Sequence, residues 1–201
     1  MARLRFKIFI FFFQFYILSF LLLANTQSIS FGLGSGQTNV VSTQYKAKST
    51  SSAEVEARFS YGLTNQWSLL GQYQGATDSS ITSFILGASF DTSPLRTHSG
   101  SFNHEGVPEI EKVPKWLFRF SVGLGTFQFS NSLESSDKNL GTKNEVVVEA
   151  SLYGFAFDAG VYRFFNSELA AYAKLTEAIA SAGNFGINRT NIIFGVFWLQ
   201  N

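Results

Sequence analysis

Apolar and polar residues alternate along most of the chain beyond residue 28. In residues 54–63 every odd position is apolar, whereas the even positions are charged or small. Successive side chains of a β-strand point to opposite faces of a sheet, so this period of two predicts a strand with one wholly apolar face. The same alternation recurs in residues 29–33, 82–90, 116–124 and 191–198. The pattern therefore predicts an all-β protein.

Eight antiparallel strands account for the pattern, and eight is an even number, as bacterial membrane barrels require. The longest interval between two of these strands, residues 92–115, is irregular and holds all three prolines and both histidines. The predicted strands span residues 28–45, 53–63, 67–76, 81–91, 116–130, 144–165, 169–178 and 188–199.

The sixth of these strands is about twice as long as the 9–11 residues that cross a membrane. Its apolar positions are even as far as Leu152 and odd from Tyr153 onward. This shift predicts a β-bulge or a tight hairpin near Gly154. An alternative with ten strands divides the chain at Gly154 and also at Gly36. The choice between eight and ten strands decides on which side of a membrane residues 92–115 lie.

Composition indicates what the apolar faces contact. Charged residues make up 14% of the chain, against about 25% in a typical soluble domain, and aromatic residues make up 16%. The second face of the strands carries mainly glycine, serine and single charges, which suits a narrow lumen better than a water-exposed surface. A transmembrane β-barrel turns its apolar face to lipid and its small and polar residues inward. Closure also leaves no unpaired backbone in hydrocarbon, so we expect a closed antiparallel transmembrane β-barrel.

A soluble barrel is the alternative to this interpretation. In a periplasmic lipocalin-like protein the same alternation would turn the apolar face inward, around an apolar ligand. The two hypotheses place one set of side chains oppositely, either lining a cavity or facing lipid: Phe84, Leu86, Phe118 and Phe120.

The first 28 residues have the features of an export signal. Arg3, Arg5 and Lys7 precede a run from Ile8 to Ala24 that contains no charged residue, and small residues follow. A basic segment, an apolar segment and small residues near a cleavage site describe a secretory signal peptide. We expect a signal peptide at residues 1–28 and a barrel domain at residues 29–201, with an uncleaved membrane anchor as the alternative.

One predicted turn resembles a known family. The string Tyr61-Gly62-Leu63-Thr64-Asn65-Gln66-Trp67 joins two alternating strands, and it resembles the periplasmic turns of bacterial outer-membrane β-barrel proteins. A related hairpin surrounds residues 166–168. The resemblance implies a small OmpA/OmpX-like barrel of the outer membrane. We expect this barrel to be monomeric, with membrane lipids, lipopolysaccharide and the barrel assembly machinery as partners and a structural, surface-interacting or minor porin-like role.

Charged residues on the presumed lumen face form the candidate site. Buried charges are tolerated only when they are paired, so we expect these residues to form a structural network that seals the lumen. A polar path or gate for a solute is the alternative, although eight strands leave a lumen only wide enough for side chains. The residues are Glu54, Glu56, Arg58, Arg119, Asp158 and Lys174.

The sequence gives little indication of nucleic-acid binding, cofactor or metal binding, or catalysis. Without its basic leader the chain is slightly acidic, so a nucleic-acid partner is not expected, because phosphate binding needs clustered positive charge. The chain has no cysteine, and we expect no cofactor, no metal and no enzymatic activity. A lipid-modifying enzyme of the outer membrane is the remaining alternative. It would draw on the serine, histidine and glutamate residues of the irregular segment: His98, Ser99, Ser101, His104, Glu105 and Glu109.

Overall fold

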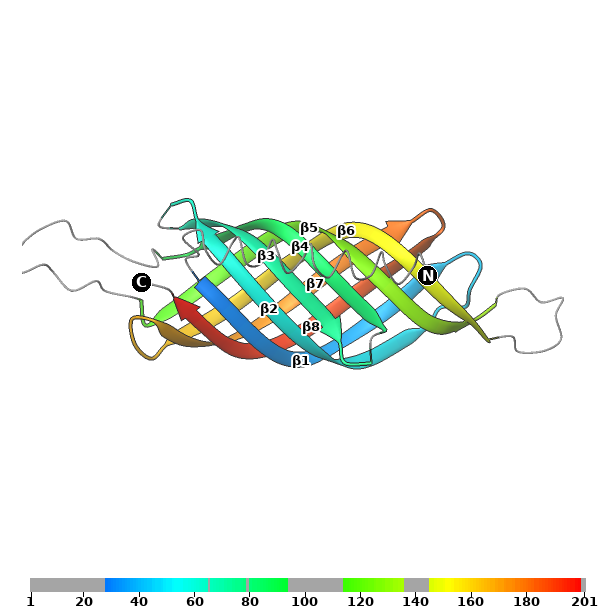
Figure 1. Ribbon diagram of the computed structural model, residues 1–201, viewed down its shortest axis with the longest axis horizontal. Coiled ribbons are helices and arrows are strands. Elements are labelled where there is room, and N and C mark those ends of the chain that lie inside the picture. Colours follow the sequence, from blue (N-terminus) through cyan, green and yellow to red (C-terminus); the bar gives the residue numbers. More distant parts are fainter. Residues whose placement is uncertain (1–27, 65, 79, 94–113, 136–144, 200–201) are drawn as a thin grey trace, which may run out of the picture.

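The protein is a closed ring of eight antiparallel strands (Figure 1). The structure is a computed structural model that describes residues 28–64, 66–78, 80–93, 114–135 and 145–199. Each strand pairs with its neighbours in sequence, and the last pairs with the first. The strands are β1 (Ser28–Ser42), β2 (Ser49–Gly62), β3 (Trp67–Ala76), β4 (Ile81–Asp91), β5 (Trp116–Glu134), β6 (Glu145–Phe164), β7 (Leu169–Ala182) and β8 (Phe185–Leu199).

The strands are strongly tilted against the long axis of the barrel, as Figure 1 shows. The register gives the reason. A path that starts at Ser30 and passes from partner to partner through all eight strands returns to β1 at Val40 instead of at its start. Such stagger is what closes a sheet into a barrel. The prediction of eight strands is confirmed, and the ten-strand alternative is wrong because β1 runs unbroken through Gly36.

The two ends of the barrel differ in what they carry. At the end that we call the termini end, β1 begins and β8 ends, and short turns join β2 to β3 and β6 to β7. Residues 92–115 connect β4 to β5 at this same end. At the opposite end, here the far end, the connections join β1 to β2, β3 to β4, β5 to β6 and β7 to β8.

Both turns predicted from the sequence are hairpins at the termini end. Thr64 Oγ1 accepts a hydrogen bond from the Trp67 backbone N–H at 2.9 Å. In the matching turn, Asn166 Oδ1 accepts one from the Leu169 N–H at 2.7 Å. A side-chain oxygen that binds the backbone two or three residues ahead stabilises the reversal of the chain. At the far end, β7 and β8 join through Gly183, whose φ of 59° lies in the left-handed region that glycine adopts without strain.

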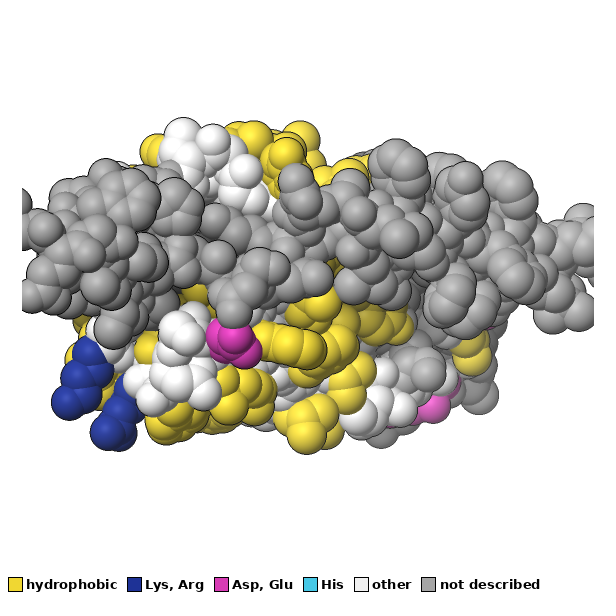
Figure 2. Space-filling model, turned by 60° about the vertical axis from the view of Figure 1, so that its left-hand side comes forward, with side chains coloured by type: hydrophobic (Ala, Val, Ile, Leu, Met, Phe, Trp, Pro, Cys, Tyr) yellow, Lys and Arg dark blue, Asp and Glu magenta, His cyan; other side chains and the backbone are white. Residues whose placement is uncertain are grey.

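The outer wall of the barrel is apolar. Leu86, Phe118 and Phe120 are 55%, 54% and 42% exposed, and Figure 2 shows hydrophobic side chains on the described part of the face in view. These side chains point away from the lumen, so the lipocalin-like hypothesis is wrong. An aromatic girdle marks the termini end, because all three tryptophans are exposed there at strand ends: Trp67, Trp116 and Trp198.

Strand β6 contradicts the predicted bulge or hairpin at Gly154. It pairs with β5 in one unbroken register from Trp116–Arg163 to Glu134–Glu145. The apolar phase changes because the lumen itself changes. Near the far end the inward positions of β6 are apolar, whereas Asp158 faces inward further along. The change of phase therefore marks a boundary inside the lumen, and the strand stays regular.

Four strands extend beyond their predicted limits at the far end. Strand β2 begins at Ser49, β5 continues to Glu134, β7 continues to Ala182 and β8 begins at Phe185. Several of these added residues are serine or asparagine on both faces of the strand, so no alternation signals them in the sequence. The predicted signal peptide precedes Ser28 almost entirely and lies outside the described residues. Within the described ranges no helix is long and apolar enough to span a membrane.

Lumen-facing glycines let neighbouring strands approach closely. Six of them meet in three directly opposed pairs across strands, namely Gly32–Gly195, Gly87–Gly123 and Gly125–Gly154. A Cβ at Gly87 would overlap the carbonyl oxygen of Val122 and lie 2.6 Å from the Gly123 Cα. Backbone cannot move aside as a flexible side chain can, so position 87 needs glycine.

We expect Gly87→Ala to lower the free energy of unfolding by about 1–3 kcal/mol, the usual effect of overpacking a tight interior. The measurement is urea unfolding of the folded barrel in lipid vesicles. The matched control is Gly75→Ala on the outward side of β3, where a Cβ would meet only side-chain atoms, the nearest at 3.1 Å. The control should change stability by less than about 1 kcal/mol. Equal effects of the two substitutions would contradict this account of the glycine pairs.

Candidate functional site: the barrel lumen

All six predicted site residues face the lumen and are buried. Glu54, Glu56 and Arg58 occupy successive inward positions of β2. Arg119 comes from β5, Asp158 from β6 and Lys174 from β7. The alternation of each strand accounts for these orientations, because the outward neighbours of these residues are apolar or small.

Four of the six form one cluster in the middle of the lumen. Lys174 Nζ lies 2.6 Å from Glu56 Oε2 and 3.4 Å from Asp158 Oδ2. Arg58 Nη1 lies 3.1 Å from Asp158 Oδ2, and the Arg58 guanidinium also donates to Ser121 Oγ. Two cations thus meet two carboxylates, so the cluster carries no net formal charge. We call these four residues, Glu56, Arg58, Asp158 and Lys174, the central cluster.

Neutral groups of the surrounding strands complete the cluster. Lys174 Nζ donates to Gln72 Oε1 at 3.2 Å. Glu56 accepts from Gln74 Nε2 at 2.9 Å and from the Tyr172 hydroxyl at 3.1 Å. Charges removed from water need such additional hydrogen bonds as well as an opposite charge. The central cluster is therefore linked to neutral side chains on β3 and β7 as well as internally.

The other two predicted residues pair with partners that the sequence analysis missed. Glu54 forms an ion pair with Arg189 of β8 and accepts a hydrogen bond from Ser52 Oγ at 2.8 Å. Arg119 makes a two-pronged ion pair with Asp91 of β4, with N–O distances of 2.6 and 2.8 Å.

The alternation of inward and outward positions could have identified both partners, Asp91 and Arg189. Asp91 is the next inward position of β4 after Ser89, and Arg189 precedes Asn191 on the inward face of β8. Both lie at or near the ends of the predicted strands. Continuing the alternation to the strand ends would have found both.

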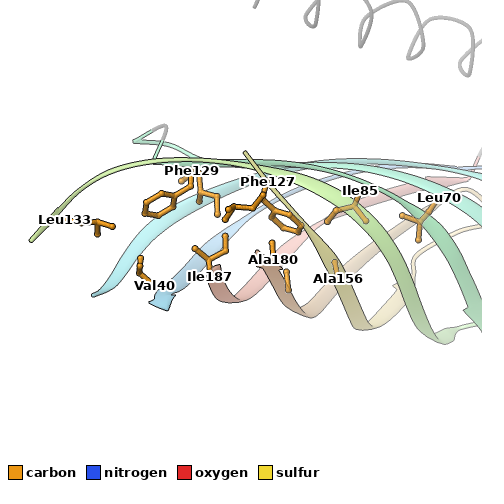
Figure 3. Close-up of a cluster of buried hydrophobic side chains, with 13 residues drawn as sticks. Val40, Leu70, Ile85, Phe127, Phe129, Leu133, Ala156, Ala180 and Ile187 are labelled. Carbon is orange, nitrogen blue, oxygen red and sulfur yellow. The ribbon is translucent and has the colours of Figure 1, made fainter. Parts of the chain in front are cut away.

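An apolar layer closes the lumen toward the far end. Figure 3 shows buried side chains from several strands that point toward one another, among them Phe127, Phe129, Leu133 and Ile187. Phe129 also packs against Phe185, with ring centroids 5.3 Å apart. These side chains fill the interior between the charged middle and the far end.

The connection between β1 and β2 crosses this apolar layer. Tyr45 forms an isolated β-bridge with Ser135, and the Lys46 backbone N–H donates to the Glu134 carbonyl at 3.0 Å. Strand β5, which ends at Glu134, is not a neighbour of β1 or β2 in the ring. The segment that contains Tyr45 therefore reaches across the far end of the barrel to the end of β5.

A second layer, rich in aromatic rings, lies toward the termini end. Tyr162 stacks on Tyr172 with centroids 5.2 Å apart and meets Phe197 edge-on at the same distance. The Arg119 guanidinium carbon lies 5.3 Å from the Tyr162 ring centroid and 5.0 Å from that of Phe197. Leu117 and Leu199 are fully buried in this layer. The charged middle thus lies between two layers of close-packed side chains.

Other predicted chemistry falls largely outside the described part of the chain. The histidines, serines and glutamates of the enzyme hypothesis, from His98 to Glu109, are outside the described residues. Among the residues that the structure describes, no group of three or more histidines, aspartates or glutamates is arranged to hold a metal ion.

Comparisons with known proteins support the fold. No protein-family model matches the sequence, and no curated protein matches it. Among solved structures, the N-terminal β-barrel domain of OprF from Pseudomonas aeruginosa aligns with a TM-score of 0.50 and 12% identity, over 86% of this chain and 97% of that one. Neisserial surface protein A, NspA, aligns with a TM-score of 0.51 and 11% identity, over the same shares of the two chains. The chain thus has the fold of small outer-membrane β-barrels, as the resemblance of its turn implied.

Proposed function

We propose that this protein is an integral barrel of the bacterial outer membrane with a sealed lumen, whose role is structural or surface-interacting and not enzymatic. The observation that supports this proposal is that the outer wall is apolar and the interior is filled by side chains. A belt of exposed leucine, valine, isoleucine and aromatic side chains surrounds the ring. Exposed apolar surface of this extent is stable only against lipid or a large partner.

The filled lumen argues against a conducting role. A solute would have to displace the aromatic layer near Tyr162, break the ion pairs of the central cluster and pass the apolar layer at Phe127. Each of these groups is buried and in contact with others. Binding then belongs to the ends of the barrel, where its loops lie, or to its outer wall.

Orientation and partners follow from export. A barrel that inserts from the periplasm keeps its termini there, so we place the termini end on the periplasmic side and residues 92–115 with it. The outer wall would contact phospholipid and lipopolysaccharide, and the barrel assembly machinery would insert the chain. We propose a monomer, because the ring closes within one chain.

Membrane integration is tested by fractionation and by migration in a gel. The folded protein should stay with outer membranes after carbonate extraction, and it should migrate differently before and after boiling. Release by carbonate would show that the barrel is not integral. Denaturing conditions that leave the migration unchanged would argue against a closed barrel.

The sealed lumen is tested by electrical recording. Purified protein in a planar bilayer should produce no steady channel, with a porin of known conductance as positive control and protein-free bilayers as baseline. Reproducible stepwise currents from the purified protein would overturn the proposal of a sealed lumen and favour the passage of small solutes.

A further inference from the structure

The described outer wall has a hollow near the termini end. A groove of about 490 Å³ runs across β5, β6, β7 and β8. Its floor consists of Ala159 and Val161 of β6 and Ala173 of β7. Val161 pairs in register with Ala173, and Ala159 is the next outward-facing residue of β6. Its walls are the bulky side chains Phe118 and Phe120 on β5 and Leu175 and Ile192 on β7 and β8.

The groove lies in the apolar belt of the barrel, which faces the hydrocarbon of the bilayer in the proposed membrane location. Its outward-facing lining side chains are all apolar, and the small residues of its floor leave space between two rows of large ones. An unfilled hollow loses van der Waals contacts along its whole lining. A flexible hydrocarbon chain is the group that fills such a channel in a bilayer.

Positive charge lies next to the groove at the membrane boundary. Arg163 follows Val161 on the same face of β6 and pairs in register with Trp116, whose ring centroid lies 5.4 Å from the Arg163 guanidinium carbon. The Lys115 carbonyl accepts a hydrogen bond from the Phe164 N–H at 3.1 Å, which places Lys115 beside the same strand. Both cationic side chains are exposed, and Figure 2 shows Lys or Arg side chains gathered at its left-hand end.

The Trp116–Arg163 pair lies one same-face position beyond the Phe118–Val161 pair that lines the groove, so exposed positive charge and a tryptophan adjoin an apolar groove. We propose that the groove binds an anionic glycerophospholipid of the periplasm-facing leaflet. One acyl chain occupies the groove, and the phosphate contacts Arg163 and Lys115. Tryptophan prefers the membrane interface, so Trp116 marks the depth of the headgroup. This inference rests on the proposed membrane location of the barrel.

The experiment uses bromine, which quenches tryptophan fluorescence on contact. In a background with Trp67→Phe and Trp198→Phe, Trp116 is the only tryptophan. The barrel is placed in phosphatidylcholine nanodiscs that contain a few per cent of acyl-brominated phosphatidylglycerol. Each variant is compared with itself in unbrominated lipid of the same headgroup, because Arg163 affects Trp116 fluorescence directly.

Trp116 should be quenched as if the brominated lipid were enriched roughly fivefold or more at the site, since each cation near a membrane surface favours anionic lipid by about that factor. Brominated phosphatidylcholine at the same fraction should quench only in proportion to its amount. Arg163→Gln with Lys115→Gln should abolish the enrichment. Ala173→Leu, which fills the groove and keeps the charges, should reduce it. The matched control is Ala57→Leu on the outward side of β2, which should leave it intact.

Three results would overturn the inference. Quenching that follows the bulk fraction of brominated lipid would show ordinary lipid contact. Enrichment that survives Ala173→Leu would show surface attraction without a groove. Dimers that Ala173→Leu dissociates would show that a second copy fills the groove. If fully brominated bilayers also fail to quench Trp116, the barrel is not embedded in lipid, and the proposed function fails instead.

Discussion

Replacement of Lys174 by methionine should lower the free energy of unfolding by about 3–5 kcal/mol, the usual loss when one member of a buried ion pair is removed. Lys174 Nζ contacts both carboxylates of the central cluster, at 2.6 and 3.4 Å. Methionine has a similar length but no charge, so Glu56 loses its cation while it stays buried. Arg58 then remains as the cation that contacts Asp158. The measurement is urea unfolding in lipid vesicles, followed by the gel shift between folded and unfolded forms.

Two controls test whether the loss of stability arises because the unpaired charge is buried, and not simply because a lysine is removed. Lys46→Met breaks an ion pair of similar length, 2.8 Å from Lys46 Nζ to Glu134 Oε2, between side chains that are 62% and 36% exposed. Exposed pairs contribute about 0–1 kcal/mol, so this variant should be nearly as stable as the parent. The double variant Lys174→Met with Glu56→Gln removes both charges of the shortest contact and should recover much of the loss. A Lys174→Met barrel with parental stability would show that the ion pairs of the central cluster do not stabilise the barrel.

The orientation of the strands was predictable because it depends only on neighbouring residues. The odd apolar positions of residues 54–63 face outward in β2, and the matching positions of residues 116–124 do so in β5. The belt around the barrel repeats one rule, apolar side chains toward lipid, so each strand could be oriented without knowledge of the others.

The pairing inside the lumen was not predictable in the same way. Arg58 and Asp158 lie 100 positions apart in sequence. They meet because the ring places β2 and β6 on opposite sides and the stagger of the strands brings the two residues to the same level. The sequence also cannot show that the lumen changes from polar to apolar along its length, which is why the change of phase near Gly154 suggested a bulge. The local alternation indicates whether a side chain faces the lumen or the lipid. Which residue it meets across the lumen depends on the register of every strand between the two residues.

The outer belt itself is tested by Leu86→Arg. Leu86 is 55% exposed, and it lies between Phe84 and Ala88 on the outward side of β4. An arginine near the middle of a bilayer destabilises a transmembrane barrel by about 2–4 kcal/mol, because its charge must leave water or drag water into hydrocarbon. We expect that loss in vesicles, measured by urea unfolding and by a lower yield of folded protein.

A second arginine substitution, placed outside the apolar belt, distinguishes the loss of stability at Leu86 from a general effect of arginine. Ser130→Arg is the matched control, because Ser130 also points outward and is exposed, but it lies beyond the apolar outward positions of β5, after Thr126 and Gln128. There the charge reaches headgroups or water, and the expected loss is about 0–1 kcal/mol. In a barrel surrounded by water, neither arginine would be buried, and both variants would be about as stable as the parent. The difference between the two substitutions therefore measures directly whether the phenylalanines and leucines around the ring contact acyl chains.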